Sequence, residues 1–407
     1  GRVPKCVDIR INAGMDNTWG VGTVQSVMKY CGVRYGNDGC VGWRGLSRES
    51  FPGTLSRRIV ADVSTPDPVV LREQFPSLES CSVKAGVENQ AAMLVIAAMS
   101  YLRSVLGIRL EDKPSELLHR WILSQRWLMR LVSSSVGVMK VSVVSDGNDP
   151  LRYEYSLLAE HGDGPKVPCS PCVLLAERMW RASKKGSGQR REEGRVDTAV
   201  SIQDLEEYWQ EMGLSITTRS SLRTFRSPLI ECIGDQQFKR LSPAIAKAHA
   251  WGGKCEGELQ VTGSKNPLVR LAMWALGKPP PTSSPIPVSV KVVPMPAKEG
   301  VTFQRTFTYP KKGPKTLISE WVMHNGGLHE TFDGFQTVGF EARENNGGFI
   351  LVGRSTWPLP ELPWLNLVRV YASVVPTNNN NFDLDVRVSA PLVGLLFGYK
   401  GWLKVVD

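Results

Sequence analysis

Long apolar runs are nearly absent from this sequence of 407 residues. The run at residues 91–99 is apolar on all sides, but it contains only nine residues. A helix that spans a bilayer needs about 20 consecutive apolar residues. This run therefore cannot cross a membrane as a helix.

Cysteine is sparse, with eight residues in the chain. This number is too low for a disulfide-stabilised scaffold and is typical of a reducing compartment. Cys169 and Cys172 form a CxxC pair, but His161, Cys232 and Cys255 lack the spacing of a second zinc-ligand pair. A lone CxxC can be redox-active at a helix N-terminus, but outside a thioredoxin-like context a structural role is favoured. We predict no metal site.

Familiar catalytic patterns are also missing: there is no G-x-S-x-G, no H-E-x-x-H, no P-loop and no acidic metal box. Gly20-Val21-Gly22 begins a dinucleotide fingerprint, but Gln25 occupies the third glycine position. The histidines are scattered, at His119, His161, His249, His324 and His329. We expect no cofactor-binding residue and no complete active site in this chain.

Basic residues exceed acidic ones, with a net charge of +10, and they are densest between residues 103 and 195. Such a surplus can attract phosphates or an anionic membrane, or it can be a solvated face with one mobile loop. We favour the second interpretation. No RNA- or DNA-reading motif accompanies the charge, so no nucleic-acid partner is predicted.

The first part of the chain mixes helix and strand patterns, which favours an α/β arrangement. Residues 42–80 read as turns, and residues 115–132 form an amphipathic helix with two Trp among several Arg. That helix can lie in a membrane interface, although covering a core is favoured. The remaining expected elements are a strand at 6–11, helices at 23–31, 89–106, 171–181 and 201–212, a hairpin from 138–144 and 153–159, and a strand at 214–218.

The second part is dominated by period-two alternation, which is typical of strands. After a helix that begins at Ser264 and a stiff Pro-rich segment at 279–285, apolar residues alternate with polar ones in several segments. We predict an α+β protein: a mixed α/β domain at 1–218, a connector at 219–235, and at 236–407 a mainly antiparallel β domain, a curved sheet with one or two helices.

Arg305 is the one charged side chain that alternation places among aromatic residues, beside Phe303, Phe307 and Tyr309. A guanidinium in such a place must be paired, because an unpaired buried charge costs several kcal/mol. Glu320 and Glu330 are candidate partners. Either Arg305 binds an anionic group of a ligand, or it forms a structural ion pair, and we favour the pair.

Several segments carry a family resemblance. In the first part these are residues 22–26, 30–32, 65–67, 84–88 and 157–168. This part resembles the C-terminal, substrate-side region of saccharopine-dehydrogenase-like oxidoreductases. In the second part the segments are residues 241–249, 304–307, 328–330, 390–394 and 399–403. This part resembles a domain of unknown function that is commonly fused behind that oxidoreductase.

The resemblance implies an upstream Rossmann domain that binds NAD(P), and Gly1 looks like the start of a piece cut from a longer protein. The chain would then be the substrate-side and accessory portion of an NAD(P)-dependent oxidoreductase, inactive without that domain. The alternative is a non-enzymatic module that binds a lipid or amphiphile and touches a membrane with one helix. We expect a cytoplasmic protein, peripheral to membranes in the second case. The candidate ligand-binding residues are Arg305, Glu330, Tyr399 and Trp402; catalytic residues are not identified.

Overall fold

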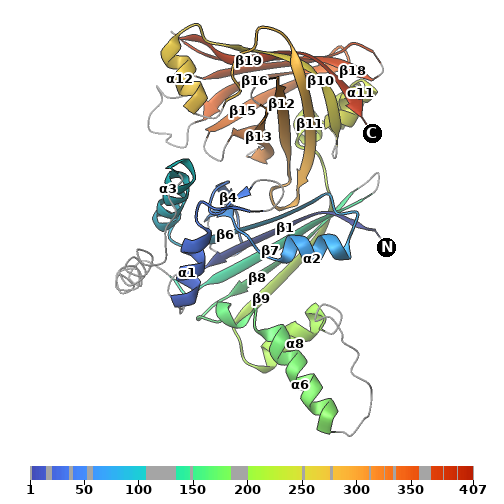
Figure 1. Ribbon diagram of the computed structural model, residues 1–407. Coiled ribbons are helices and arrows are strands. Elements are labelled where there is room, and N and C mark those ends of the chain that lie inside the picture. Colours follow the sequence, from blue (N-terminus) through green and yellow to red (C-terminus); the bar gives the residue numbers. More distant parts are fainter. Residues whose placement is uncertain are drawn as a thin grey trace.

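Seven strands of the N-terminal part form one mixed sheet (Figure 1). The computed structural model describes residues 2–14, 21–35, 40–52, 58–106, 134–146, 150–184, 200–249, 253–275, 278–310, 313–324, 326–332, 336–356, 368–378, 380–391 and 393–406. The order of the sheet is β4-β5-β6-β1-β7-β8-β9. Only β1 and β6 pair in parallel within the described part of this sheet; the other neighbours are antiparallel.

The strands of this sheet are β1 (Pro4–Ala13), β4 (Ser47–Glu49), β5 (Arg58–Asp62), β6 (Ser80–Val87), β7 (Gly137–Ser145), β8 (Leu151–Ala159) and β9 (Ile216–Thr224). A separate small pair consists of β2 (Arg34–Tyr35) and β3 (Cys40–Val41). The helices of this part are α1 (Val21–Tyr30), α2 (Asp67–Gln74), α3 (Gln90–Leu106), η1 (Gly164–Lys166), α6 (Ser170–Lys184) and α8 (Ile202–Glu211).

The predicted hairpin is confirmed as β7 and β8, and the helix predicted at 89–106 is α3. The region 42–80, predicted as turns, instead contains β4, β5 and α2. These elements are short and lie among Gly, Pro and Ser residues, so no long periodic pattern marks them. Residues 219–224, placed in the connector, continue strand β9. The amphipathic helix predicted at 115–132 lies outside the described residues.

The C-terminal part is a closed antiparallel barrel of ten strands, β10 to β19 in sequence order. This corrects the prediction of a curved sheet, because the first strand pairs with the last: Lys254 lies opposite Val406 and Gly263 opposite Phe397. The strands are β10 (Lys254–Gly263), β11 (Ile286–Met295), β12 (Gly300–Tyr309), β13 (Gly313–His324), β14 (Gly327–Phe332), β15 (Gln336–Asn345), β16 (Gly348–Thr356), β17 (Arg369–Pro376), β18 (Asn381–Ala390) and β19 (Gly394–Val406).

Helices lie at both ends of the barrel (Figure 1). Three short helices, α9 (Pro228–Ile233), α10 (Asp235–Phe238) and α11 (Pro243–His249), pack at the end where β10 begins and β19 ends. Helix α12 (Pro267–Ala275) lies near the opposite end, where β10 ends and β19 begins. Within the described ranges, no helix combines the length and the hydropathy that crossing a membrane requires.

The two parts meet where the connection between β11 and β12, the short helix η2 (Pro296–Lys298), packs on β1 and β7. Three side chains of the N-terminal sheet bind its backbone. Asp8 Oδ2 accepts from Ala297 N at 3.1 Å, and Lys140 Nζ donates to Ala297 O at 3.1 Å. Arg152 Nε donates to Pro296 O. A buried backbone group without a partner is costly, so these bonds fix where the barrel contacts the sheet.

Candidate ligand site inside the barrel

The barrel interior is filled mainly by aromatic and branched side chains, in agreement with the alternation of its strands. Arg305, Phe303, Phe307 and Tyr309 on β12 all point inward and are buried. The predicted placement of Arg305 among aromatic residues is therefore confirmed.

Glu330 on β14 is the carboxylate that pairs with Arg305; its Oε1 lies 3.3 Å from Arg305 Nη2. Ser319 joins the two groups, since its Oγ accepts from Arg305 Nη1 at 2.6 Å and donates to Glu330 Oε1 at 2.5 Å. The guanidinium also lies over the ring of Phe303, 4.9 Å from the ring centre. The other candidate, Glu320, binds Lys298 instead. Arg305 therefore belongs to a buried, hydrogen-bonded ion pair.

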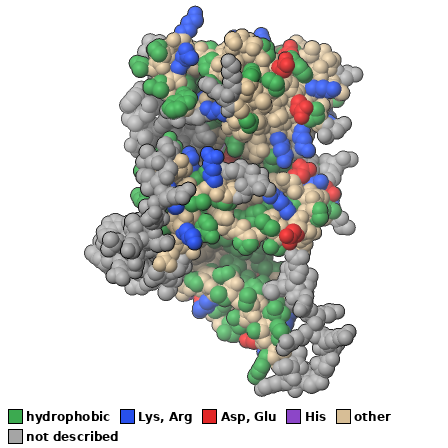
Figure 2. Space-filling view, viewed as in Figure 1, with side chains coloured by type: hydrophobic (Ala, Val, Ile, Leu, Met, Phe, Trp, Pro, Cys, Tyr) green, Lys and Arg blue, Asp and Glu red, His purple; other side chains and the backbone are tan. Residues whose placement is uncertain are grey.

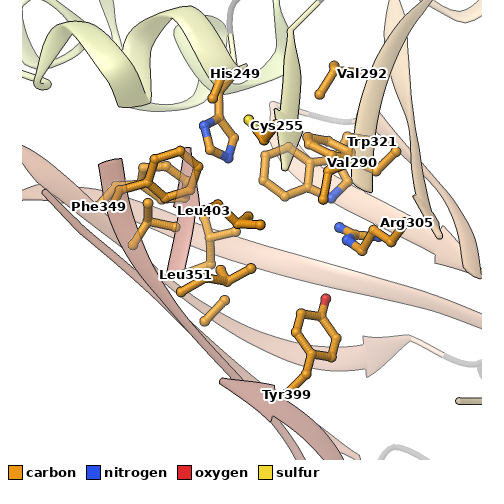
Figure 3. Close-up of a pocket in the computed structure, with 16 residues that line it drawn as sticks. His249, Cys255, Val290, Val292, Arg305, Trp321, Phe349, Leu351, Tyr399 and Leu403 are labelled. Carbon is orange, nitrogen blue, oxygen red and sulfur yellow. The ribbon is translucent and has the colours of Figure 1, made fainter. Parts of the chain in front are cut away.

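A cavity of about 50 Å³ is lined in part by Arg305 (Figure 3). The side of the cavity near α11 is formed by His249, Cys255 and Phe349, and Tyr399 on β19 points into it from the opposite side. Apolar side chains complete the lining, among them Val290, Val292, Leu351 and Leu403. The enclosure combines a few polar groups with an apolar wall, as small-molecule sites do.

Trp321 on β13 lines this cavity and carries a buried polar atom without a hydrogen-bond partner among the described residues. Its side chain is 5% exposed, and among the described residues its indole Nε1 has no hydrogen-bond partner. Most buried polar atoms in proteins are paired with protein groups or ordered water, so an unpaired one calls for an explanation. Sequence reasoning missed this residue, although the alternation of Leu317, Ser319 and Trp321 could have placed it inside.

Burial shifts the pKa of three titratable groups of the cavity, His249, Cys255 and Tyr399, toward the neutral form. It lowers the pKa of His249 to about 4, and the positive charge of Arg305 acts in the same direction, against a hydrogen bond to Ile245 O. Burial raises the pKa of Cys255 to about 12. It also raises the pKa of Tyr399, which Arg305 lowers and Glu330 raises by smaller amounts. A protonated thiol and phenol beside a neutral imidazole can bind a ligand, but none of them is an activated nucleophile.

The four predicted ligand-binding residues are not brought together as one group. Arg305, Glu330 and Tyr399 are buried in the barrel interior. Trp402 is 43% exposed on the outer surface, near Glu258 and Lys404. Residues three apart on a strand face opposite sides, which explains why Tyr399 and Trp402 separate.

Groups of three or more His, Cys, Asp or Glu side chains placed to hold a metal ion do not occur in the described part of the chain. Cys169 and Cys172 are both exposed at the start of α6.

One family model matches the barrel region. Residues 241–403 match the model of a domain of unknown function, DUF4166. The expected C-terminal domain of unknown function is thus present, whereas nothing identifies a saccharopine-dehydrogenase-like part in the chain. No functionally curated protein matches this sequence.

Two solved structures are similar to the chain at low identity. A protein of unknown function from the DUF3598 family of Nostoc punctiforme is 8% identical, with 68% of each chain covered and a TM-score of 0.24. Transferrin binding protein B of Haemophilus parasuis is 10% identical, with 66% of this chain and 35% of that chain covered and a TM-score of 0.18. Neither TM-score reaches 0.5, and neither likeness supports an argument about this protein.

Proposed function

We propose that the barrel, in which residues 241–403 match a domain of unknown function, is a binding module. Its ligand is a small carboxylate, or the carboxylate head group of an amphiphile, held in the interior cavity. The observation that carries this proposal is that Trp321 lines the cavity and that its buried indole N–H has no partner among the described residues.

An acceptor oxygen in the cavity would give this N–H the partner that it lacks. Leaving a buried donor unsatisfied costs about 1–3 kcal/mol. A ligand oxygen that accepts from Trp321 Nε1 recovers that free energy. The donor thus favours ligands with a carboxylate or another strong acceptor over purely apolar ones.

Arg305 adds positive potential on the same cavity. Ser319 and Glu330 each accept one hydrogen bond from its terminal nitrogens Nη1 and Nη2. A guanidinium has five N–H groups, so two bonds leave donor capacity for a ligand oxygen. The nearby carboxylate of Glu330 balances the charge and keeps the guanidinium oriented, which reduces the cost of ordering it on binding.

The volume sets the size of the ligand. A cavity of about 50 Å³ has room for a few waters, since one water needs about 10–15 Å³. A two- to four-carbon acid fits this space, with its alkyl part against Val290, Val292 and Leu351. A longer amphiphile would place only its head group in the cavity. Its tail would extend toward the barrel end, where side chains would have to move.

Thermal unfolding and isothermal titration calorimetry with a series of carboxylates, from acetate to octanoate, test the proposal. We expect the melting temperature to rise with the short members, and Trp321→Phe to abolish the rise because phenylalanine has no N–H. Trp209→Phe is the matched control: Trp209 is also buried, but its Nε1 donates to Ser170 Oγ at 2.9 Å in the N-terminal part. A wild-type protein that ignores every carboxylate, or a Trp321→Phe variant that responds like wild type, contradicts the proposal.

Arg305→Met separates a ligand contact from a purely structural one. A folded variant that has lost carboxylate binding supports the proposed site. A variant whose barrel no longer folds shows that the ion pair with Glu330 serves the structure, and Trp321→Phe then decides alone.

Participation in hydride transfer stays a prediction of the family resemblance. Its test lies upstream in the gene: a coding sequence without a strand–GxGxxG–helix segment before Gly1 removes the oxidoreductase interpretation.

A further inference from the structure

The exposed face of helix α12 is an interaction surface, and we infer that it docks on an anionic lipid membrane. The inference does not depend on the ligand cavity, because α12 lies outside the barrel, and either proposal can fail without the other.

Three large apolar side chains of α12 face solvent. Leu268 is 74% exposed, Leu271 60% and Trp274 68%. Residues three apart in a helix lie on the same side, so these three form one apolar strip. Figure 2 shows hydrophobic side chains gathered at the place of α12, with Lys or Arg side chains beside them.

The charges on this stretch of the chain have one sign. No Asp or Glu occurs between Glu258 and Glu299, a stretch that includes all of α12. Lys265 and Arg270 are exposed next to the apolar strip. Basic residues near an anionic bilayer each contribute about 1 kcal/mol of attraction.

This charge pattern distinguishes a lipid surface from a second copy of the chain. In a symmetric dimer through α12, the basic side chains of both copies would face one another, and like charges at an interface are unfavourable. An anionic membrane offers both an apolar layer for Leu271 and Trp274 and opposite charge for Arg270. Tryptophan is also enriched where apolar and aqueous layers meet.

The surroundings of α12 can accept part of a lipid. A groove of about 390 Å³ runs between α12 and the barrel end, lined by Leu271, Met273, Pro280 and Phe397. The helix has nine residues, too few to cross a bilayer, so a membrane-bound α12 would lie along the interface with its apolar strip inserted. The barrel end beside α12 then faces the membrane.

Vesicle co-sedimentation with the full chain tests the inference. We expect binding to phosphatidylcholine vesicles that contain about 30% phosphatidylserine, weak binding to phosphatidylcholine alone, and loss of the difference at high salt, where charge interactions are screened. The variant Leu271→Glu/Trp274→Glu should bind anionic vesicles at least about tenfold more weakly, since it removes the apolar strip and adds negative charge.

Trp180→Glu on α6 is the matched control, because Trp180 is a helical tryptophan with 59% exposure in the N-terminal part. It should bind vesicles like wild type, and circular dichroism should show both variants folded. Equal vesicle binding by the wild type and the α12 variant overturns the inference. A wild-type protein that does not bind anionic vesicles also overturns the inference. If light scattering then shows a dimer that the α12 variant disrupts, the surface is a contact between two copies of the chain.

Discussion

Lys298 and Glu49 come from the two different parts of the chain and lie 4.0 Å apart, Nζ to Oε1, where the barrel meets the N-terminal sheet. Glu49 on β4 is 1% exposed and is also approached by Arg10 Nε at 3.4 Å and Lys140 Nζ at 3.8 Å. Burial alone raises the pKa of Glu49, but the charges of Lys298, Arg10 and Lys140 together lower it below its ordinary value. Glu49 therefore lies among three buried cations, of which Arg10 is also paired with Asp8 and Lys298 with Glu320.

Glu49→Gln should destabilise the protein by about 3–5 kcal/mol, because it removes a buried negative charge from among three cations and leaves Lys140 without its ion-pair partner. Denaturant unfolding at neutral pH measures the loss. Glu177→Gln, which breaks an exposed pair with Arg181, should change stability by less than about 0.5 kcal/mol. Similar losses for the two variants would show that the buried network contributes nothing beyond a surface pair.

His249 should make stability depend on pH. Its folded pKa of about 4 lies below the ordinary value of 6.5, so the unfolded chain takes up a proton that the folded chain does not. Stability is complete above pH 6.5 and falls as pH decreases toward 4, by up to about 3 kcal/mol.

Unfolding measured between pH 7 and pH 5 checks this dependence, in a range above the titration of most carboxylates. His249→Phe should flatten the slope, since phenylalanine takes up no proton and fits among Phe303, Phe349 and Phe382. His161→Asn, at an exposed position, should leave the slope as it is. An unchanged slope in His249→Phe would assign the pH dependence to other groups.

Trp321 and Trp209 should respond differently to loss of the indole N–H, even without a ligand. Trp321→Phe removes an unpaired donor, whereas Trp209→Phe removes a donor that binds Ser170. We expect Trp209→Phe to cost about 1–3 kcal/mol more than Trp321→Phe. Thermal or denaturant unfolding of the two variants gives the comparison, and the reverse order would mean that the N–H of Trp321 is satisfied in solution.

Gly401 should be required at the seam that closes the barrel. A Cβ atom at this position would lie 2.1 Å from the backbone O of Glu258 on β10, so Gly401→Ala must push β10 and β19 apart. We expect a loss of about 1–3 kcal/mol. Gly327→Ala is the control in the same barrel, with its nearest contact at 3.6 Å to the His329 side chain. Equal stability of the two variants would show that β10 and β19 separate enough to accept the added methyl group without a loss of stability.

Local patterns were enough to predict many elements. The alternation of apolar residues marked β11, β12 and β18, and amphipathic or apolar runs marked α3 and α12. The same alternation placed Arg305 inside, because the period of a strand is two whatever the strand pairs with. The short elements β4, β5 and α2 were missed, since a few residues between turns carry too little periodicity.

The contact of Arg305 with Glu330 depends on registers that local patterns do not contain. Glu320 and Glu330 were both reasonable candidates, but the pairing of β12 with β13 sets Glu320 opposite Thr302, outside the interior. The pairing of β13 with β14 sets Glu330 opposite Trp321, inside it. A one-residue difference in register exchanges the two faces of a strand.

The sequence by itself determined which side chains share a strand face, and so the buried aromatic and charged character of the barrel interior. Only the tertiary structure decided that the sheet closes and that Trp321, Arg305 and Tyr399 line one cavity. Closure depends on the pairing of β10 with β19. In this pairing Lys254 lies opposite Val406, although most of the domain separates the two residues in the sequence. Such a contact follows from the twist and number of all ten strands together, and no single segment carries it.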